Sequence, residues 1–166
     1  MRILIGIVGY RNLSDLSVGH NLMAELQALE WEPGVEIEDL SFGPIAVVQN
    51  LEARPAYDRM IFLSATQRGR APGRIYRSEY RQELPSDEEI QGRIVEAVTG
   101  VVDLDNLLVI AQHFRVLAEE VIIVEIEPIE VEFAEKCSDA VVALGPEILE
   151  IVRAEAYGTS HSARAR

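Results

Sequence analysis

The chain has 166 residues, 48% of them hydrophobic, which is enough for one domain with a sizeable core but too little for two ordinary domains. Its formal net charge of −13 disfavours binding to nucleic acids and anionic membranes, because both need a basic surface. No apolar run approaches the roughly 20 residues that a membrane helix needs, no N-terminal stretch resembles a signal peptide, and the single cysteine, Cys137, excludes an internal disulfide. We therefore expect a cytoplasmic protein that binds neither nucleic acid nor membranes.

The N-terminal segment predicts a strand, a loop and a helix. Residues 3–8 form an apolar run of strand length, typical of a buried strand in a parallel sheet, and the run ends at Gly9. After a polar loop, apolar residues recur at helical spacing from Leu16 onward. Three residues are candidate N-caps of this helix: Ser14, Asp15 and Ser17. Ligand sites of open α/β sheets form at the carboxyl ends of such strands, so we expect the loop from Gly9 to Gly19 to border the functional site.

The remaining segments alternate between strand and helix patterns. Strands are predicted at residues 35–40, 57–63, 74–80 and 121–126, the third of them a charged edge strand in antiparallel orientation. Helices are predicted at residues 45–51, 85–98 (with a stop at Gly100), 103–117, 138–144 and 146–156. This order indicates a three-layer α/β/α sandwich with a mostly parallel sheet and one antiparallel edge strand. We expect residues 1–157 to form a single domain and residues 158–166 to be a disordered tail.

Residue patterns alone point to no well-known catalytic centre. The chain lacks a Walker A motif and a GxGxxG loop, which disfavours a dinucleotide site. The three histidines, His20, His113 and His161, are not at metal-ligand spacing on one helix. Cys137 has no base beside it in the sequence and is interpreted as a small buried hydrophobic residue.

Two polar groups follow predicted elements at places where sites form. Ser64 ends a strand, but it lacks the GxSxG context of a serine hydrolase. Asp103, Asp105 and Asn106 precede an apolar helix. They are either helix caps or an oxygen-rich corner of a site, and both interpretations stay open.

Several segments together resemble the hydrogenase maturation proteases. Residues 3–19 are spaced like the family's GxGNxLxxDDGxG opening, and the positions in register are Gly9, Leu13, Asp15 and Gly19. Residues 35–43, 58–63, 71–76 and 121–128 resemble the family's second strand, third strand, APG hairpin and late strand. The resemblance covers nearly all of residues 1–157. It implies a protein that trims a C-terminal extension from the large subunit of a nickel–iron hydrogenase after nickel insertion.

The resemblance also implies a cleft in which a Glu, an Asp and a His contact nickel. The corresponding positions here are Leu16, Ser64 and Asp103. Leucine cannot coordinate a metal and neutral serine is a poor ligand, so we expect no tightly bound metal, and nickel would be carried by the substrate. The loops at Gly9, Tyr10 and Gly43 are expected to border the substrate cleft.

Three accounts of the function remain open. In the first, the chain is a divergent endopeptidase that meets the substrate's nickel through other groups, with Asp15, Asp103 and Asp105 as candidates. In the second, it is a non-proteolytic binding module or assembly chaperone for a hydrogenase large subunit on the same fold. In the third, it is a small-molecule-binding α/β module with no link to hydrogenases. Whether the chain is an enzyme is therefore left open.

Overall fold

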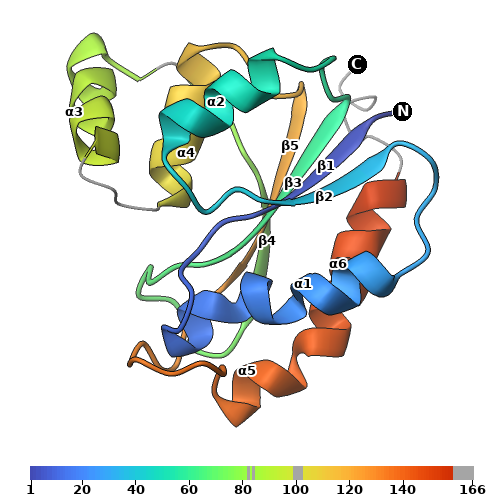
Figure 1. Cartoon of the computed structure of the whole chain (residues 1–166). Coiled ribbons are helices and arrows are strands. Elements are labelled where there is room, and N and C mark those ends of the chain that lie inside the picture. The colour runs from blue at the N-terminus through green and yellow to red at the C-terminus, as the bar shows by residue number, and fades with distance from the viewer. Residues whose placement is uncertain (82, 84, 99–102, 159–166) are drawn as a thin grey trace, which may run out of the picture.

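A five-stranded sheet in the order β2–β1–β3–β5–β4 forms the centre of the protein (Figure 1). The computed structural model describes residues 1–81, 83, 85–98 and 103–158. Its strands are β1 Ile3–Ile7, β2 Val35–Asp39, β3 Arg59–Ala65, β4 Ile75–Glu79 and β5 Glu120–Ile126. Three pairings are parallel, and β4 lies antiparallel to β5 at the edge, which confirms the predicted sheet.

Helices cover both faces of this sheet. They are α1 Val18–Ala28, α2 Pro44–Glu52, α3 Asp87–Val98, α4 Leu104–His113, α5 Asp139–Ala143 and α6 Gly145–Tyr157, with a 3-10 turn, η1 Ser14–Ser17, before α1. Side chains of α1, α5 and α6 pack on one face and side chains of α2 and α4 on the other. Helix α3 packs against α4 (Figure 1). The three-layer α/β/α architecture is therefore confirmed.

Alternation along β1 explains how one short strand serves two cores. All five of its residues are buried. Ile3, Ile5 and Ile7 contribute to the core under α1 and α6, whereas Leu4 contributes to the core under α2 and α4. Successive side chains of a strand point to opposite faces, so a continuous apolar run is what a doubly covered strand requires.

Strand β3 ends later than its sequence pattern indicates. We predicted that the strand stops at residue 63, but Ser64 and Ala65 continue the ladder opposite Glu125 and Ile126 of β5. A polar residue at the end of a strand is compatible with pairing when the neighbouring strand extends equally far. Ser64 is consequently held in the sheet rather than in a loop.

The predicted side-chain caps of the first helix are wrong. Helix α1 has Ser17 as its N-cap residue, but no side chain caps it. The Ser17 hydroxyl instead accepts a hydrogen bond from the Leu13 amide at 2.9 Å. Asp15 binds a distant segment, as described below, the Ser17 hydroxyl is used by the neighbouring loop, and the buried Ser14 hydroxyl has no hydrogen-bond partner among the described residues.

Helix α6 ends at Tyr157, and Gly158 is the last residue that the structure describes. Gly158, which we assigned to the tail, accepts a hydrogen bond from the buried Arg59 guanidinium at 2.8 Å and thus belongs to the folded part. The rest of the predicted tail, including His161, and the predicted helix stop at Gly100 lie outside the described residues. Among the helices that are described, none combines the length and the apolar character needed to cross a membrane.

Close packing of α1 on β1 gives a first prediction. A Cβ atom added at Gly19 would lie 2.5 Å from the Ile7 methyl carbon Cγ2. Gly19→Ala should therefore lower the free energy of unfolding by roughly 1–3 kcal/mol, as overpacking does in other cores. Gly92→Ala is the control, because Gly92 lies on an exposed part of α3 with no atom near its added Cβ. That change should raise stability by up to about 1 kcal/mol. Urea denaturation measures both, and equal stability of the Gly19 variant and the wild type would contradict the packing argument.

Candidate functional site

The sheet topology creates a place for a ligand at the carboxyl ends of β1 and β3. From β1 the chain crosses to β2 on one side, and from β2 it returns past β1 to β3 on the other side. Helices α1 and α2 therefore lie on opposite faces, and the loops after β1 and β3 diverge. Ligands of open α/β sheets bind at such switch points.

A cleft of about 320 Å³ lies at this switch point. Its wall comes from the end of β1 and the loop after it, from the end of β3, and from the first turn of α4. The lining residues are Val8, Gly9, Tyr10, Leu16, Ser64, Ala65, Thr66, Gln67, Arg68, Asp103, Leu104 and Asp105. Leu16, Ser64 and Asp103, which the family resemblance selected from three distant parts of the chain, are thus brought together.

Two other residues selected from the sequence, Asp15 and Gly43, do not line the cleft. Gly43 is the N-cap residue of α2, with its carbonyl accepting hydrogen bonds from the first turn of that helix. The loop that contains it reaches the cleft only indirectly, because the Ser41 hydroxyl accepts a hydrogen bond from the Gly9 amide at 3.0 Å. Gly43 therefore caps α2 and does not border the cleft, and Ser41 makes the contact between its loop and the cleft wall.

Asp15 joins the loop after β1 to the segment after β5. It is completely buried. Its Oδ2 accepts hydrogen bonds from the amides of Ile129 and Glu130, both at 2.9 Å, and from the Ser138 hydroxyl at 3.0 Å. Its Oδ1 accepts from the Ser138 amide at 2.7 Å. Since both oxygens face these donors, the position suits a structural anchor better than the metal ligand that we predicted.

Asp103 and Asp105 begin α4 at the cleft wall. Asp103 is the N-cap residue, and its Oδ1 accepts a hydrogen bond from the Asp105 amide at 2.8 Å. Capping, the first of the two interpretations left open, is therefore confirmed for Asp103. Both residues line the cleft as well, so the polar corner also exists.

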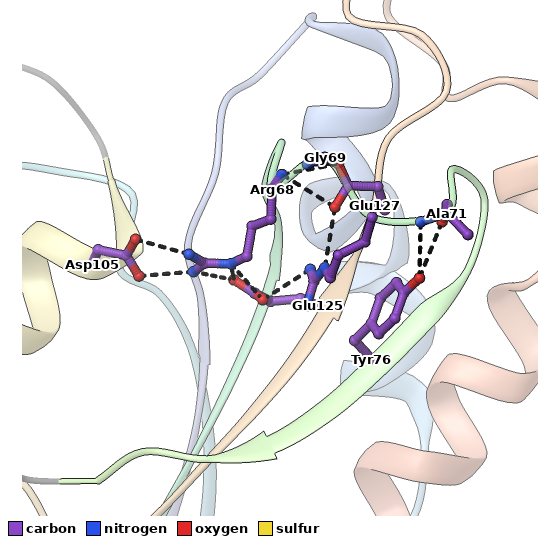
Figure 2. Close-up of polar contacts among 8 residues, drawn as sticks. Arg68, Gly69, Ala71, Tyr76, Asp105, Glu125 and Glu127 are labelled. Atoms are coloured by element: carbon purple, nitrogen blue, oxygen red, sulfur yellow. Dashed lines mark hydrogen bonds and ion pairs between the residues drawn. The ribbon is translucent and has the colours of Figure 1, made fainter.

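The Arg68 guanidinium lies between two carboxylates at the cleft (Figure 2). It donates to Glu125 through Nε and Nη2, with a shortest distance of 2.7 Å, and to Asp105 through Nη1 at 3.1 Å and Nη2 at 2.8 Å. The Glu125 side chain is only 4% exposed. These hydrogen bonds, first to Glu125 and then to Asp105, raise the pKa of the Arg68 guanidinium above its usual value. The Arg68 guanidinium therefore stays positively charged at the cleft.

Glu127 lies next to Glu125 (Figure 2), and it forms a second ion pair, with Arg70. Arg70 pairs with Glu125 at 3.1 Å and with Glu127 at 3.2 Å, and its guanidinium stacks over the Tyr76 ring at 3.9 Å. Glu127 also accepts from the amides of Arg68 and Gly69. Burial opposes ionisation of Glu127, but these hydrogen bonds outweigh it and lower its pKa below the usual value. The buried carboxylates therefore hold the loop that forms one cleft wall.

The residues of this cleft do not fit a metal. Leu16 offers no donor atom, and Asp105 is paired with Arg68, whose charge would repel a divalent cation. Over the ranges that the structure describes, no group of three His, Cys, Asp or Glu side chains is placed to hold a metal ion. The donor set thus differs from the Glu, Asp and His that the resemblance implies.

Sequence reasoning missed the Arg68–Glu125 pair. One signal was present, because Glu125 interrupts the apolar run of the strand predicted at residues 121–126, and a buried carboxylate needs a partner. Nothing in the spacing identifies Arg68 as that partner. Cys137, in contrast, is buried as predicted, and burial raises the pKa of its thiol.

These features define the class of the protein: a three-layer α/β/α protein with a cleft at its topological switch point. Its fold is that of the hydrogenase maturation proteases, so the resemblance seen in the sequence is confirmed at the level of the fold.

Three solved structures illustrate this likeness. The hydrogenase maturating endopeptidase HybD from E. coli has a TM-score of 0.69 and 20% identity, covering 95% of this chain and 94% of that one. A hydrogenase 2 maturation peptidase from Thaumarchaeota archaeon SCGC_AB-539-E09 has a TM-score of 0.66 and 24% identity over 96% and 100%. The [NiFe] hydrogenase maturation protease HybD from Thermococcus kodakarensis has a TM-score of 0.61 and 17% identity over 94% and 99%. No protein-family model and no curated protein sequence matches the chain.

The buried Asp15 gives a second prediction. Asp15→Asn would present an amide NH₂ group to backbone donors, so we expect a loss of roughly 2–4 kcal/mol in the free energy of unfolding. Glu119→Gln is the control, because Glu119 is exposed and its change should stay within about 0.5 kcal/mol. Thermal or urea unfolding of both variants measures the difference. Equal stability of the two variants would show that Asp15 is not an anchor.

The lowered pKa of Glu127 gives a third prediction. Folding lowers this pKa, so the group stabilises the folded state above its unfolded pKa of about 4.3 and loses that effect as the pH falls toward the folded value. Glu127→Gln should be less stable than the wild type near neutral pH, and the gap should narrow below about pH 4. Urea unfolding as a function of pH measures this. A gap that stays constant down to low pH would contradict it.

Proposed function

We propose that this protein takes part in the maturation of a nickel–iron hydrogenase large subunit by binding the C-terminal region of that subunit in the cleft, without cleaving it. The printed names of the similar structures describe hydrogenase maturation peptidases, and the likeness extends over nearly the whole of both chains. The cleft at the switch point is the place where this fold offers a binding site.

The observation that carries the proposal is the guanidinium of Arg68 in a cleft whose family-equivalent ligand positions are Leu16, Ser64 and Asp103. Peptide cleavage needs a group that activates water or polarises the carbonyl. Leu16 can do neither, and the Arg68 guanidinium donates to Glu125 and Asp105. Binding needs only shape and polar complementarity, which this cleft offers.

Nickel is part of the substrate under this proposal, and the protein itself holds no metal tightly. Compensation of Glu125 and Asp105 by Arg68 supports this, because these carboxylates need no further cation. We also propose a cytoplasmic location, since a single buried free thiol suits a reducing compartment.

A divergent endopeptidase is the second candidate. It is favoured by the position of Asp103 and Asp105 on the cleft wall, where carboxylates could meet a metal that the substrate already holds. A metal held by the substrate needs few ligands from the protease. In this version Asp105 would have to exchange its contact with Arg68 for one with the substrate.

The deciding experiment mixes the purified protein with the nickel-loaded precursor of a hydrogenase large subunit encoded near its gene. Size-exclusion chromatography should show a stable complex, and mass spectrometry should show the precursor at unchanged mass. Loss of mass at the precursor's C-terminus would overturn the non-proteolytic version and support the endopeptidase. If the experiment shows no complex and no loss of mass, both versions are rejected and the small-molecule-binding module remains.

A substitution at the cleft wall tests whether the precursor binds in the cleft. Gln67 is exposed at the cleft wall, so Gln67→Trp should narrow the cleft and weaken the complex by about tenfold or more. Gln49→Trp on the exposed side of α2 is the matched control and should bind like the wild type. Equal affinity of both variants would show that the precursor binds elsewhere.

A further inference from the structure

Residues 129–133 expose apolar and acidic side chains in strict alternation. Ile129, Val131 and Phe133 are 47%, 38% and 81% exposed, and Glu130 and Glu132 between them are exposed as well. We call these five residues the docking strip. Several exposed large apolar side chains within five residues are unusual and often mark a surface for a partner.

The docking strip is held firmly at both ends. At its start, Asp15 accepts from the Ile129 and Glu130 amides, and the Asp15 amide donates to the Glu130 carbonyl at 3.2 Å. At its end, Ala134 exchanges backbone hydrogen bonds with Asn12 and Ser14, both at 3.1 Å. A surface that is already ordered loses little conformational entropy when a partner binds.

The docking strip does not line the cleft itself, but it is joined to segments that form or hold the cleft wall. Glu127, two residues before the strip, accepts from the amides of Arg68 and Gly69. Asp15, which holds the strip, directly precedes Leu16 on the cleft wall. Figure 1 shows the segment after β5 beside the turn before α1, and the Leu13–Ala134 backbone bridge joins the two. A chain that lies in the cleft can therefore pass over the strip.

The charge of the docking strip and of the cleft indicates which kind of partner would bind there. Glu130, Glu132 and Glu135 are exposed, with Lys136 as the basic residue beside them. At the cleft, the four carboxylates of Asp103, Asp105, Glu125 and Glu127 exceed the two guanidinium groups of Arg68 and Arg70 by two charges. Both areas are thus negative, so the matching occupant carries Lys or Arg side chains among apolar ones.

We propose that the docking strip binds a basic, apolar, extended segment of a partner protein, and that Tyr10 at the cleft continues this contact toward the cleft. The strip offers both exposed apolar and exposed acidic side chains, and a segment with Lys or Arg among apolar residues complements both kinds. The exposure and the charge of the docking strip are independent of the proposed function. Only the identity of the partner as a hydrogenase large subunit rests on the proposed function.

A peptide pair tests the surface directly. The probes are two synthetic fluorescent peptides of equal length, one alternating Lys and Val and the other Glu and Val, and fluorescence anisotropy measures their binding. The Lys–Val peptide should bind the wild type, and affinity should fall by about tenfold or more in Ile129→Ser/Phe133→Ser and in Glu130→Lys/Glu132→Lys. The Glu–Val peptide should not bind.

Two control variants test whether changes of charge or apolarity elsewhere on the surface also weaken peptide binding. Glu119→Lys changes an exposed carboxylate elsewhere, and Val142→Ser removes a 57% exposed apolar side chain on α5. Both should bind the Lys–Val peptide like the wild type. Equal weakening in Glu119→Lys and the strip variants, or no weakening in the strip variants, would overturn the proposal.

The large-subunit precursor distinguishes failure of this inference from failure of the proposed function. If the precursor binds the wild type and the strip variants equally, the docking strip is wrong while the proposed function stands. If the Lys–Val peptide needs the strip but the precursor does not bind at all, the docking strip stands and the partner is another basic protein. Weakened precursor binding in both strip variants supports the docking strip and the proposed function together.

Discussion

The carboxylate of Glu125 is buried at the end of a central strand, and the rest of the site depends on how this charge is compensated. An unpaired buried carboxylate costs several kcal/mol, so the fold requires a cation at this place. Arg68 and Arg70 provide it from the loop between β3 and β4. The pairing therefore fixes the position of that loop, which forms one wall of the cleft, and places a guanidinium in the cleft.

Fold and chemistry separate clearly in this protein. Strand order and crossover direction place a cleft at the ends of β1 and β3. The side chains in that cleft are an independent matter: a leucine, a serine, a capping aspartate and a paired arginine. Likeness of fold therefore does not by itself establish a shared reaction or a shared partner.

Asp15 couples the cleft to the surface beside it. One buried carboxylate orders both the turn that carries Leu16 and the start of the exposed segment after β5. Hydrogen bonds from backbone amides to a carboxylate are charge-assisted and directional, so the two segments keep a fixed mutual position. A binding surface and a cleft that share one anchor can engage a single extended chain.

The sequence by itself determined the order of strands and helices, the antiparallel edge strand and the edge of the sheet where the cleft lies, because hydrophobic periodicity reports local burial. The resemblance to the hydrogenase maturation proteases, seen in the sequence, also pointed to Leu16, Ser64 and Asp103. Only the tertiary structure decided that Asp15 is an anchor and that Arg68 pairs with Glu125. Those contacts join residues far apart in the chain, and they depend on the register of β3 against β5 and on loop paths, which no local pattern encodes.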